Sequence, residues 1–385
     1  MNFEKIQNIN SQIISLKKNK KQWLFILPTD GIQGSEHIVK SLAYYKFSYS
    51  DECNIIILTK KKSGGWEAAE KTMKVTYFPF SSYFMGILYL IPYLLLNYKY
   101  YNTIDYTFTS QTIINGMIGF GKRIGLLDGA LVILRESNSI FDLLKGIKLK
   151  IYTFFYRLGY KESHLVICQT DYMKQQLIDA LPKLSSQLNL QVIPNPFSFD
   201  DISKKSGAVI PELENKQFLV AAGRLAPAKG FDILIESFNQ LTKHNDELCL
   251  VILGEGKDRA ILQNRINELN LTEKIYMPGY VQNVYSYFKK AEVCVLSSRI
   301  EGFPNVLLQM MSQNTKIVAT LCAGGIEEIP KISTCQTNSV DDLVIAIEKI
   351  LDENTDAYRT TFDNYLSKRT LHSFSEMIIK NLNNN

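Results

Sequence analysis

The sequence has few of the residues that build metal centres and disulfide frameworks. Its 385 residues include six cysteines and four histidines, and no two cysteines form a C-x-x-C pair. No D-x-D motif stands at the end of an expected strand. Cys168, Cys249 and Cys294 lie in apolar, strand-like runs, which indicates small buried hydrophobic residues in a reducing compartment. We therefore expect no metal, no disulfide and no cofactor.

The sequence also lacks a long uninterrupted apolar run. The longest candidate, YFMGILYLIPYLLLNYKYY at 83–101, has about 14 continuous apolar residues and contains Pro92. A spanning helix needs roughly 20. The stretch therefore predicts either a helix packed inside a domain or a helix that dips into a lipid surface. No signal-peptide pattern is expected, because lysines between residues 17 and 21 interrupt any apolar segment there.

Charge is divided unevenly along the chain. Residues 1–195 carry 23 Lys and Arg against 14 Asp and Glu, whereas the remaining 190 residues carry 20 against 24. The basic half could face an anionic membrane or a phosphorylated acceptor, or it could be an ordinary solvated surface. We expect no nucleic-acid partner.

Strand-like apolar runs alternate with helical patterns in both halves, which predicts an α/β fold with parallel sheets. The runs are 23–28, 54–59, 105–110, 130–137 and 164–170, then 218–224, 248–256, 275–280, 291–298 and 316–320. A proline-flanked segment at 191–197 marks a boundary between domains. We predict two doubly wound, Rossmann-like domains, 1–197 and 198–360, with a C-terminal helix in 361–385 that packs back on the first domain. Ligands of such domains bind beyond the carboxyl ends of the strands, here in a cleft between the domains.

Two cations in the second half form a candidate anion clamp. Arg224 and Lys229 follow the strand-like run 218–222 and precede a helix that begins near Gly230. An arginine offers a planar fork of donors and a lysine a mobile point charge, a pair suited to a diphosphate.

The segment EGFPNVLLQMM at 301–311 leads into a predicted helix over 304–313. Its polar residues would contact the two ends of a ligand that lies along this helix. Pro304 suits the first turn, so the amides of residues 305–307 should be unpaired and able to bind an anion. Glu301 lies before the helix, and Gln309 lies about 7.5 Å along its axis at about 1.5 Å per residue. A nucleotide-sugar could therefore lie along the helix, although Gln309 could equally be an idle surface residue.

These motifs together resemble the nucleotide-binding domain of retaining glycosyltransferase family 4, of GT-B fold. The resemblance rests on GRLAPAKG at 223–230, GEG at 254–256, PGYVQN at 278–283 and SSRIEGFPNVLLQMM at 297–311. It implies a catalytic role for Glu301, Arg224 and Lys229. The implied donor-binding residues are Gly34, Gly223, Arg224, Lys229, Gly254, Tyr280, Val281, Glu301, Gly302, Phe303, Pro304, Asn305, Val306 and Gln309. In the family an acid stands at position 309 and binds the ribose, so Gln309 should bind it more weakly, by about 1–2 kcal/mol.

The first half carries weaker signals. Gly31 and Gly34 follow the first strand and resemble the family's glycine-rich loop, which approaches the phosphate or the acceptor. The family often has a histidine after a central strand, and here that position falls on Glu136 or Ser137. Glu136, Ser137 and Asn138 could contact the sugar or the acceptor, although Glu136 could instead pair with Arg135.

The resemblance implies a metal-independent, retaining hexosyltransferase. Its donor would be a nucleoside-diphosphate sugar, with UDP favoured, and its acceptor a glycan or a lipid-linked oligosaccharide, as in O-antigen or capsule assembly. The expected location is cytoplasmic, either free or peripheral at the inner face of the cytoplasmic membrane. A catalytically weak sugar-nucleotide-binding subunit, a GT-B-like epimerase and a dinucleotide-dependent oxidoreductase are the alternatives.

Overall fold

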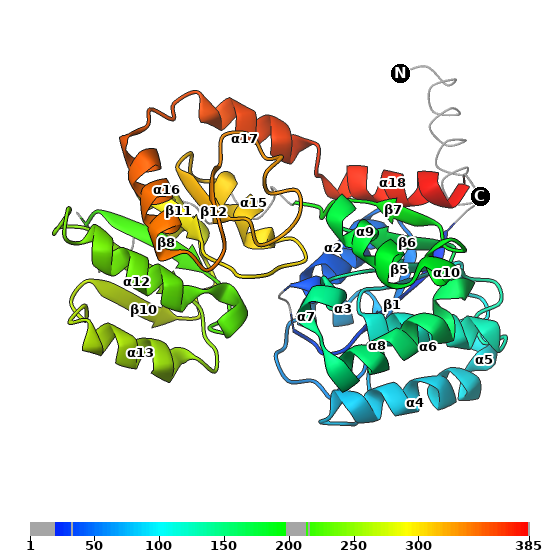
Figure 1. Ribbon diagram of the computed structural model, residues 1–385. Coiled ribbons are helices and arrows are strands. Elements are labelled where there is room, and N and C mark those ends of the chain that lie inside the picture. The colour runs from blue at the N-terminus through cyan, green and yellow to red at the C-terminus, as the bar shows by residue number, and fades with distance from the viewer. Residues whose placement is uncertain (1–19, 32–33, 198–212, 215, 384–385) are drawn as a thin grey trace, which may run out of the picture. The chain divides into compact units, whose positions relative to one another are not determined.

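The computed structural model describes residues 20–31, 34–197, 213–214 and 216–383. The chain divides into two compact units, each described here by itself. Unit 1 comprises residues 1–169, 174–193 and 374–385, and unit 2 comprises residues 170–173 and 194–373. The segment considered above for a signal peptide lies almost entirely outside the described residues. Figure 1 shows the order of the elements in each unit.

Unit 1 is a seven-stranded parallel sheet with strand order β3-β2-β1-β4-β5-β6-β7. Its strands are β1 (Gln22–Leu27), β2 (Glu52–Ile57), β3 (Lys74–Tyr77), β4 (Tyr106–Thr109), β5 (Leu131–Arg135), β6 (Leu165–Cys168) and β7 (Leu190–Val192). Its helices are α2 (Ser35–Ser48), α3 (Glu67–Glu70), α4 (Tyr83–Leu96), α5 (Tyr98–Tyr101), α6 (Thr112–Arg123), α7 (Ile140–Leu143), α8 (Gly146–Gly159), the 3₁₀ turn η1 (Tyr160–Glu162), α9 (Asp171–Ala180), α10 (Pro182–Ser185) and α18 (Leu371–Asn383).

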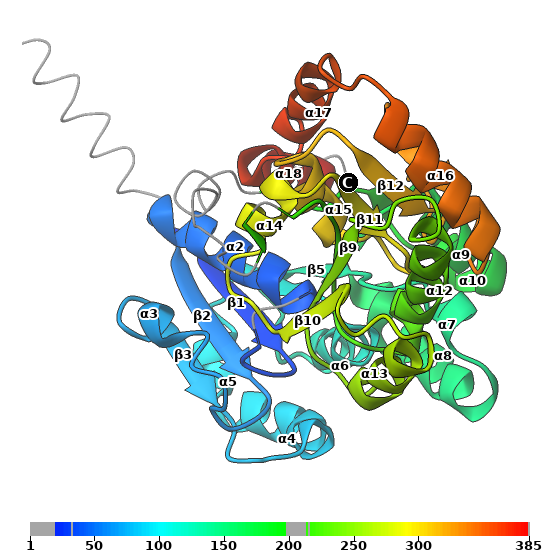
Figure 2. The same cartoon turned by 90° about the vertical axis from the view of Figure 1, so that its left-hand side faces the viewer.

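Both faces of this sheet are buried, which explains why its strands are continuous apolar runs. Successive side chains of β1 point to opposite faces: Leu24 and Ile26 join one apolar core, and Trp23, Phe25 and Leu27 join the other. The first core is covered by α4, α6 and α8, with α6 between the other two in Figures 1 and 2. The second is covered by α2 and by α18 from Phe374 onward.

Unit 2 is a six-stranded parallel sheet with strand order β10-β9-β8-β11-β12-β13. Its strands are β8 (Phe218–Ala222), β9 (Cys249–Leu253), β10 (Ile275–Gly279), β11 (Val293–Leu296), β12 (Ile317–Thr320) and β13 (Ser333–Cys335). Its helices are the 3₁₀ turn η3 (Pro227–Lys229), α12 (Phe231–Leu241), α13 (Arg259–Glu268), α14 (Tyr285–Lys290), α15 (Asn305–Met311), α16 (Val340–Asp352) and α17 (Tyr358–Ser367).

The predicted fold class of two Rossmann-like, doubly wound domains is confirmed. The predicted cleft between the domains stays a prediction. The predicted boundary after residue 197 lies a few residues beyond the division at 193/194, and residues 361–373 belong to unit 2. From Phe374 onward α18 packs in unit 1, where Phe374 and Ile378 enter the core.

The apolar stretch 83–101 forms α4 and α5, and one face of α4 packs inside unit 1, whereas the alternative contact with a lipid surface stays a prediction. One face is buried, through Ile87, Leu90 and Leu94, while Leu88 and Leu96 are exposed. Within the described ranges, no helix combines the length and the apolar character needed to cross a bilayer. Cys168, Cys249 and Cys294 are buried, as predicted, and the other three cysteines are buried as well.

Candidate functional site

The chemistry-bearing residues of unit 2 gather where its sheet changes winding direction. The strand order runs outward from β8 through β9 to β10 on one side, and from β11 through β12 to β13 on the other. The loops that follow β8 and β11 therefore leave the sheet in opposite directions, and doubly wound domains bind their ligands at such a point, beyond the carboxyl ends of the strands. Lys229 follows β8 and Glu301 follows β11, so both lie at this switch point.

Lys229 and Glu301 form an ion pair across 72 residues of sequence, through Nζ and Oε1. The side chains are 23% and 17% exposed, so the pair is sheltered but open to a ligand. The hydroxyl of Ser298 donates to the same oxygen at 2.9 Å, and the amide of Glu301 donates to the carbonyl of Cys322 at 2.8 Å. The ammonium has three donors and the carboxylate a second oxygen, so both groups keep capacity for a ligand.

The turn that carries Lys229 is held by hydrogen bonds to three successive carbonyls. The Arg299 guanidinium donates to the carbonyl of Pro227 at 2.7 Å, and the Arg299 amide donates to that of Ala228 at 2.7 Å. The hydroxyl of Ser297 donates to the carbonyl of Lys229 at 2.9 Å. The segment 297–299 thereby fixes the backbone from which the lysine side chain extends.

Arg299 is anchored in turn by polar partners outside the turn. Its guanidinium forms a bidentate pair with Asp232, at 2.8 and 2.6 Å, and Nε donates to Asn338 at 2.6 Å. Burial pushes the pKa of Asp232 upward, but the hydrogen bonds and charge of Arg299 hold it below its ordinary value. Sequence reasoning missed Arg299 and Asp232. Their signal was a cation two residues before Glu301 and an acid at the start of the helix after Lys229.

Glycines at the switch point permit close approaches of the backbone. Gly230 has φ 63°, and a Cβ there would come within 2.1 Å of the carbonyl oxygen of Ser297. Gly254 has φ 142°, and a Cβ there would lie 1.9 Å from the carbonyl oxygen of Gly223. Both positions therefore require glycine, and they bring the loops after β8, β9 and β11 together.

The helix that follows Glu301 is shorter than predicted and offers fewer amides. The predicted helix 304–313 is α15, seven residues long, with Pro304 as its N-cap. The amide of Leu307 donates to the carbonyl of Pro304 at 3.0 Å, so the prediction that it is unpaired is wrong. Asn305 accepts a hydrogen bond from the Asn195 amide at 2.7 Å.

Gln309 lies on α15 and is half-buried. Its backbone carbonyl accepts a hydrogen bond from the Ser312 hydroxyl at 2.7 Å. Its side-chain amide has no hydrogen-bond partner among the described residues. It is therefore available to a ligand, and its predicted ribose contact stays a prediction.

The other residues predicted to bind the sugar donor lie at the same edge of the sheet, and they differ in how exposed they are to solvent. Arg224 is exposed directly after β8, and Tyr280 is 53% exposed directly after β10. Val281 and Val306 are half-buried against the core of unit 2, while Gly302, Phe303 and Pro304 are buried. Arg224 and Tyr280 are thus free to move toward a ligand, whereas the rest support the loop.

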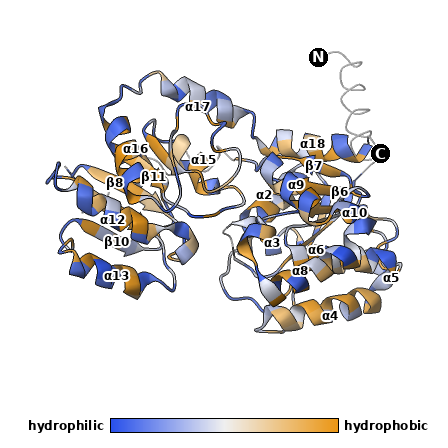
Figure 3. Ribbon diagram, viewed as in Figure 1, coloured by the Kyte–Doolittle hydropathy of each residue, from blue (hydrophilic) through white to orange (hydrophobic). Residues whose placement is uncertain are grey.

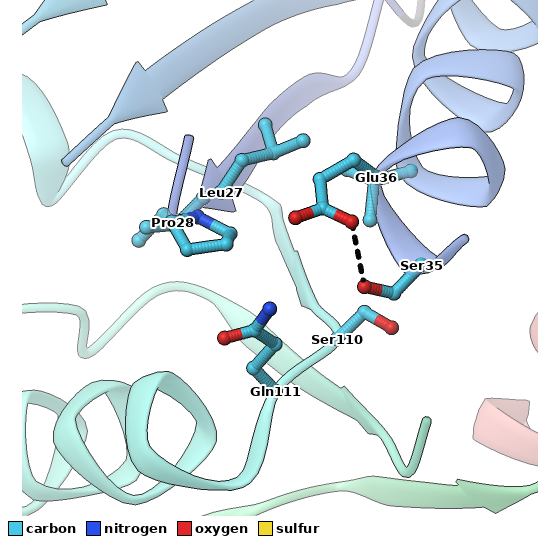
Figure 4. Close-up of a pocket in the computed structure, with 8 residues that line it drawn as sticks. Leu27, Pro28, Ser35, Glu36, Ser110 and Gln111 are labelled. Carbon is cyan, nitrogen blue, oxygen red and sulfur yellow. Dashed lines mark hydrogen bonds between the residues drawn. The ribbon is translucent and has the colours of Figure 1, made fainter. Parts of the chain in front are cut away.

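Unit 1 has a small pocket at its own switch point, between β1 and β4 (Figure 4). Leu27 and Pro28 form an apolar wall, and polar side chains from Ser35, Glu36, Ser110 and Gln111 converge on the remaining space. The hydroxyl of Ser35 donates to the Glu36 carboxylate at 3.0 Å.

Gly31 and Gly34, the glycines predicted to approach the phosphate or the acceptor, lie in the loop between β1 and α2, next to the pocket. Gly34, with φ 59°, is the N-cap of α2, and the Gly31 amide donates to the Thr29 hydroxyl at 3.4 Å. The pocket residues were not predicted. Their signal was the run of Ser and Gln directly after β4, at the carboxyl end of a central strand.

The predicted sugar contact of Glu136 is wrong, because its side chain is buried inside unit 1. It is 2% exposed and accepts hydrogen bonds from the phenols of Tyr156 and Tyr160, from Asn115 at 3.3 Å and from Thr112 at 3.4 Å. Burial raises the pKa of Glu136 against the opposing effect of these bonds. The carboxyl has all its neighbours within the core, so it holds α6 and α8 at the end of β5.

Ser137 and Asn138, which follow Glu136, lie at the surface. Ser137 is half-buried and Asn138 is exposed, and the Asn138 amide donates to the Ser137 hydroxyl at 3.4 Å. Both remain possible contacts for a sugar or an acceptor. Within the described part of the chain, no three His, Cys, Asp or Glu side chains come together as ligands for one metal ion.

Comparison with known proteins finds similarity to one family in the second half of the chain. Residues 203–369 match the family of glycosyl transferases group 1. An uncharacterized glycosyltransferase of Methanocaldococcus jannaschii is 29% identical over 199 residues, which are 50% of this chain and 48% of that protein.

A second relative is the N-acetylgalactosamine-N,N'-diacetylbacillosaminyl-diphospho-undecaprenol 4-alpha-N-acetylgalactosaminyltransferase of Campylobacter jejuni. It is 32% identical over 177 residues, which are 46% of each protein. The matches thus span about half the length of these curated relatives.

Among solved structures, Anabaena HepE in complex with UDP and glucose superimposes with a TM-score of 0.76 at 16% identity, over 95% of this chain and all of that one. This likeness shows the GT-B fold. The similarity to group 1 glycosyl transferases itself covers residues 203–369.

Proposed function

We propose that the chain is a retaining glycosyltransferase that moves a hexose-type sugar from a nucleoside-diphosphate donor, with UDP as the nucleotide, to a hydroxyl acceptor. The observation that carries this proposal is the Lys229–Glu301 pair at the switch point of unit 2, within the residues that match group 1 glycosyl transferases. The neighbour HepE was solved with UDP and glucose, which favours a UDP-sugar donor. The name of the Campylobacter relative favours an acceptor on a lipid-linked diphosphate.

The proposed reaction places cations against the departing diphosphate. The bond between the sugar's anomeric carbon and the diphosphate oxygen breaks, and the acceptor oxygen forms a new bond to that carbon on the same face. The acceptor proton passes to the leaving phosphate oxygen, so no protein base or nucleophile is required. Lys229 and Arg224 stabilise the charge that develops on the diphosphate, which is the role a divalent ion plays in other transferases.

Glu301 contributes through position and charge. Its carboxylate fixes the Lys229 ammonium at the carboxyl end of β11, while its second oxygen can accept hydrogen bonds from the sugar hydroxyls. A negative charge near the sugar also favours its oxocarbenium-like transition state. Gln309, without a side-chain partner in the described residues, can accept a hydrogen bond from the ribose.

The acceptor would use unit 1. The pocket beyond β1 and β4 is too small to enclose a sugar ring, but it carries an acid, two hydroxyls and an amide, from Glu36, Ser35, Ser110 and Gln111. These groups suit the hydroxyls of a glycan, since each can donate to or accept from a neutral polyol.

The proposal is tested by measuring binding and transfer separately. Lys229→Met should lower the turnover of a UDP-hexose by two to three decades, the scale for losing one positioned charge stabiliser. Lys274→Met is the matched control, because Lys274 is also ion-paired in unit 2, with Asp246. A control variant that loses as much turnover as Lys229→Met would refute the assignment.

Two further measurements address the mechanism and its main rival. Product anomeric configuration, read by NMR, should match that of the donor, and transfer should persist in excess EDTA. The main rival is a non-catalytic binding subunit, an alternative suggested by the amide of Gln309 in place of an acid. Such a subunit would bind UDP but would neither transfer the sugar nor slowly hydrolyse the donor. Protection from thermal unfolding by a nicotinamide cofactor alone would point instead to an oxidoreductase.

A further inference from the structure

Helix α4 exposes an unbroken apolar face. Phe84, Met85, Leu88, Leu95 and Leu96 are all exposed, Leu96 by 76%. They lie on one side of the helix, because the opposite side is buried through Gly86, Ile87, Leu90 and Leu94. The helix contains no charged residue. Contiguous exposed apolar surface of this kind marks a docking surface.

Helix α8 exposes an apolar stripe bordered by cations. Ile147, Ile151 and Phe154 are exposed at helical spacing, Ile147 by 76% and Phe154 by 58%. At about 100° per residue, Lys148 lies on one edge of this stripe, and Lys150 and Arg157 lie on the other. The helix contains no acidic residue.

The two helices belong to one layer of unit 1. Both contact α6, which lies between them (Figures 1 and 2). The contact of α8 with α6 is backbone to backbone, since a Cβ on Gly119 would lie 1.9 Å from the carbonyl oxygen of Gly159. Both exposed faces therefore point away from the sheet. The apolar colouring of α4 on this side is visible in Figure 3.

We propose that the exposed faces of α4 and α8 dock unit 1 on an anionic lipid surface. An apolar stripe with Lys and Arg at its edges fits the interface of a bilayer, where the apolar side chains enter the acyl boundary and the cations reach the headgroups. A protein partner or a second copy would require acidic groups opposite these cations.

The end of α4 has the same character. Tyr98, Lys99 and Tyr100 follow the helix and are exposed, and tyrosines with a lysine are typical of the headgroup level. The inference does not depend on the proposed activity, because it rests on the surface of unit 1 alone.

The test is co-sedimentation of the full chain with phosphatidylcholine vesicles and with vesicles that also contain phosphatidylglycerol. Binding should require the anionic lipid and should fall as salt shortens the Debye length to about 8 Å at physiological ionic strength. Lys148→Gln with Lys150→Gln should weaken binding about thirty-fold, or about fivefold for each cation near the surface. Equal partitioning to both vesicles would overturn the role of the cations.

Matched controls come from exposed residues of unit 2. Lys289→Gln with Lys290→Gln removes the same charge from α14, and Ile345→Gln removes an exposed apolar side chain from α16. Both should bind vesicles as the unmodified chain does, whereas Leu88→Gln should weaken binding about tenfold or more.

Two other results would overturn the proposal. One is a loss of vesicle binding that is equal in the control variants and the test variants. The other is absence of vesicle binding together with a dimer that Leu88→Gln dissociates in analytical ultracentrifugation, because a second copy would then cover this surface. Thermal unfolding of each variant verifies that it is folded.

Discussion

Replacing Arg299 tests whether the turn that carries Lys229 must be held in place. Arg299→Gln removes the donor to Pro227 and the bidentate bonds to Asp232. Hydrogen bonds to charged groups contribute about 1.5–3 kcal/mol each when sheltered. The Arg299 and Asp232 side chains are 26% and 52% exposed, so solvent screening should reduce the total loss of stability to about 2 kcal/mol.

The functional loss should exceed what stability alone explains. A displacement of the lysine by about 1 Å can reduce turnover by roughly a hundredfold. We therefore expect kcat/KM for a UDP-hexose to fall about a hundredfold and UDP affinity, measured by calorimetry, to fall about tenfold. Arg299→Lys should resemble Arg299→Gln, because an ammonium cannot reproduce the planar fork.

Arg359→Gln is the matched control for Arg299. Arg359 also bonds an aspartate, Asp363, and a backbone carbonyl, that of Met311, in unit 2. Its loss should lower the melting temperature comparably and leave UDP affinity unchanged. If Arg299→Gln lowers the melting temperature but binds UDP like the unmodified chain, Arg299 supports the fold and does not position Lys229.

Two further predictions concern Gln309, whose ribose contact stays a prediction, and Glu136, whose predicted sugar contact is wrong. Gln309→Glu should tighten UDP binding by up to about tenfold, or about 1.4 kcal/mol, with kcat almost unchanged, because a ribose contact is equal in ground and transition states; weaker binding in calorimetry would refute the contact. The pKa of Glu136 is raised in the folded chain. The free energy of unfolding should therefore decline as the pH rises from about 4.3, the pKa of a glutamate in the unfolded chain, through the pKa of Glu136 in the folded chain. Glu136→Gln should remove that decline in thermal unfolding and leave transfer intact; lost transfer with unchanged stability would restore the sugar contact.

The sheets could be predicted because parallel strands buried on both faces are continuous apolar runs, and helical patterns separate them. The positions of Lys229 and Glu301 at strand ends could be predicted for the same reason. Their ion pair could not, because 72 residues separate them and the pair depends on which loops the strand order places side by side. Arg299 was missed because its partners include backbone carbonyls, which leave no mark in side-chain identity.

Glu136 shows the opposite failure, in which a polar residue at a strand end was predicted to contact the sugar or the acceptor, or to pair with Arg135. The direction of its side chain depends on the pleat of β5, the strand that it follows. Its hydrogen-bond partners come from α6, α8 and η1. Tyr156 and Tyr160 are four residues apart, a spacing that places both phenols on one helical face. That spacing was a visible signal for a buried acceptor, but the sequence did not show which residue supplies it.

The two switch points differ in charge in a way that suits different ligands. Beyond β8 and β11 of unit 2, Arg224 and Lys229 provide cations, and one of them is only partly neutralised by a carboxylate that itself remains 17% exposed. Beyond β1 and β4 of unit 1, the pocket presents Glu36 with hydroxyls and an amide. A diphosphate would be attracted by the first set and repelled by the carboxylate of the second. Under the proposed function, two units of nearly the same strand order would therefore bind an anionic donor in unit 2 and a neutral polyol in unit 1, and the difference would lie in the residues that follow the central strands.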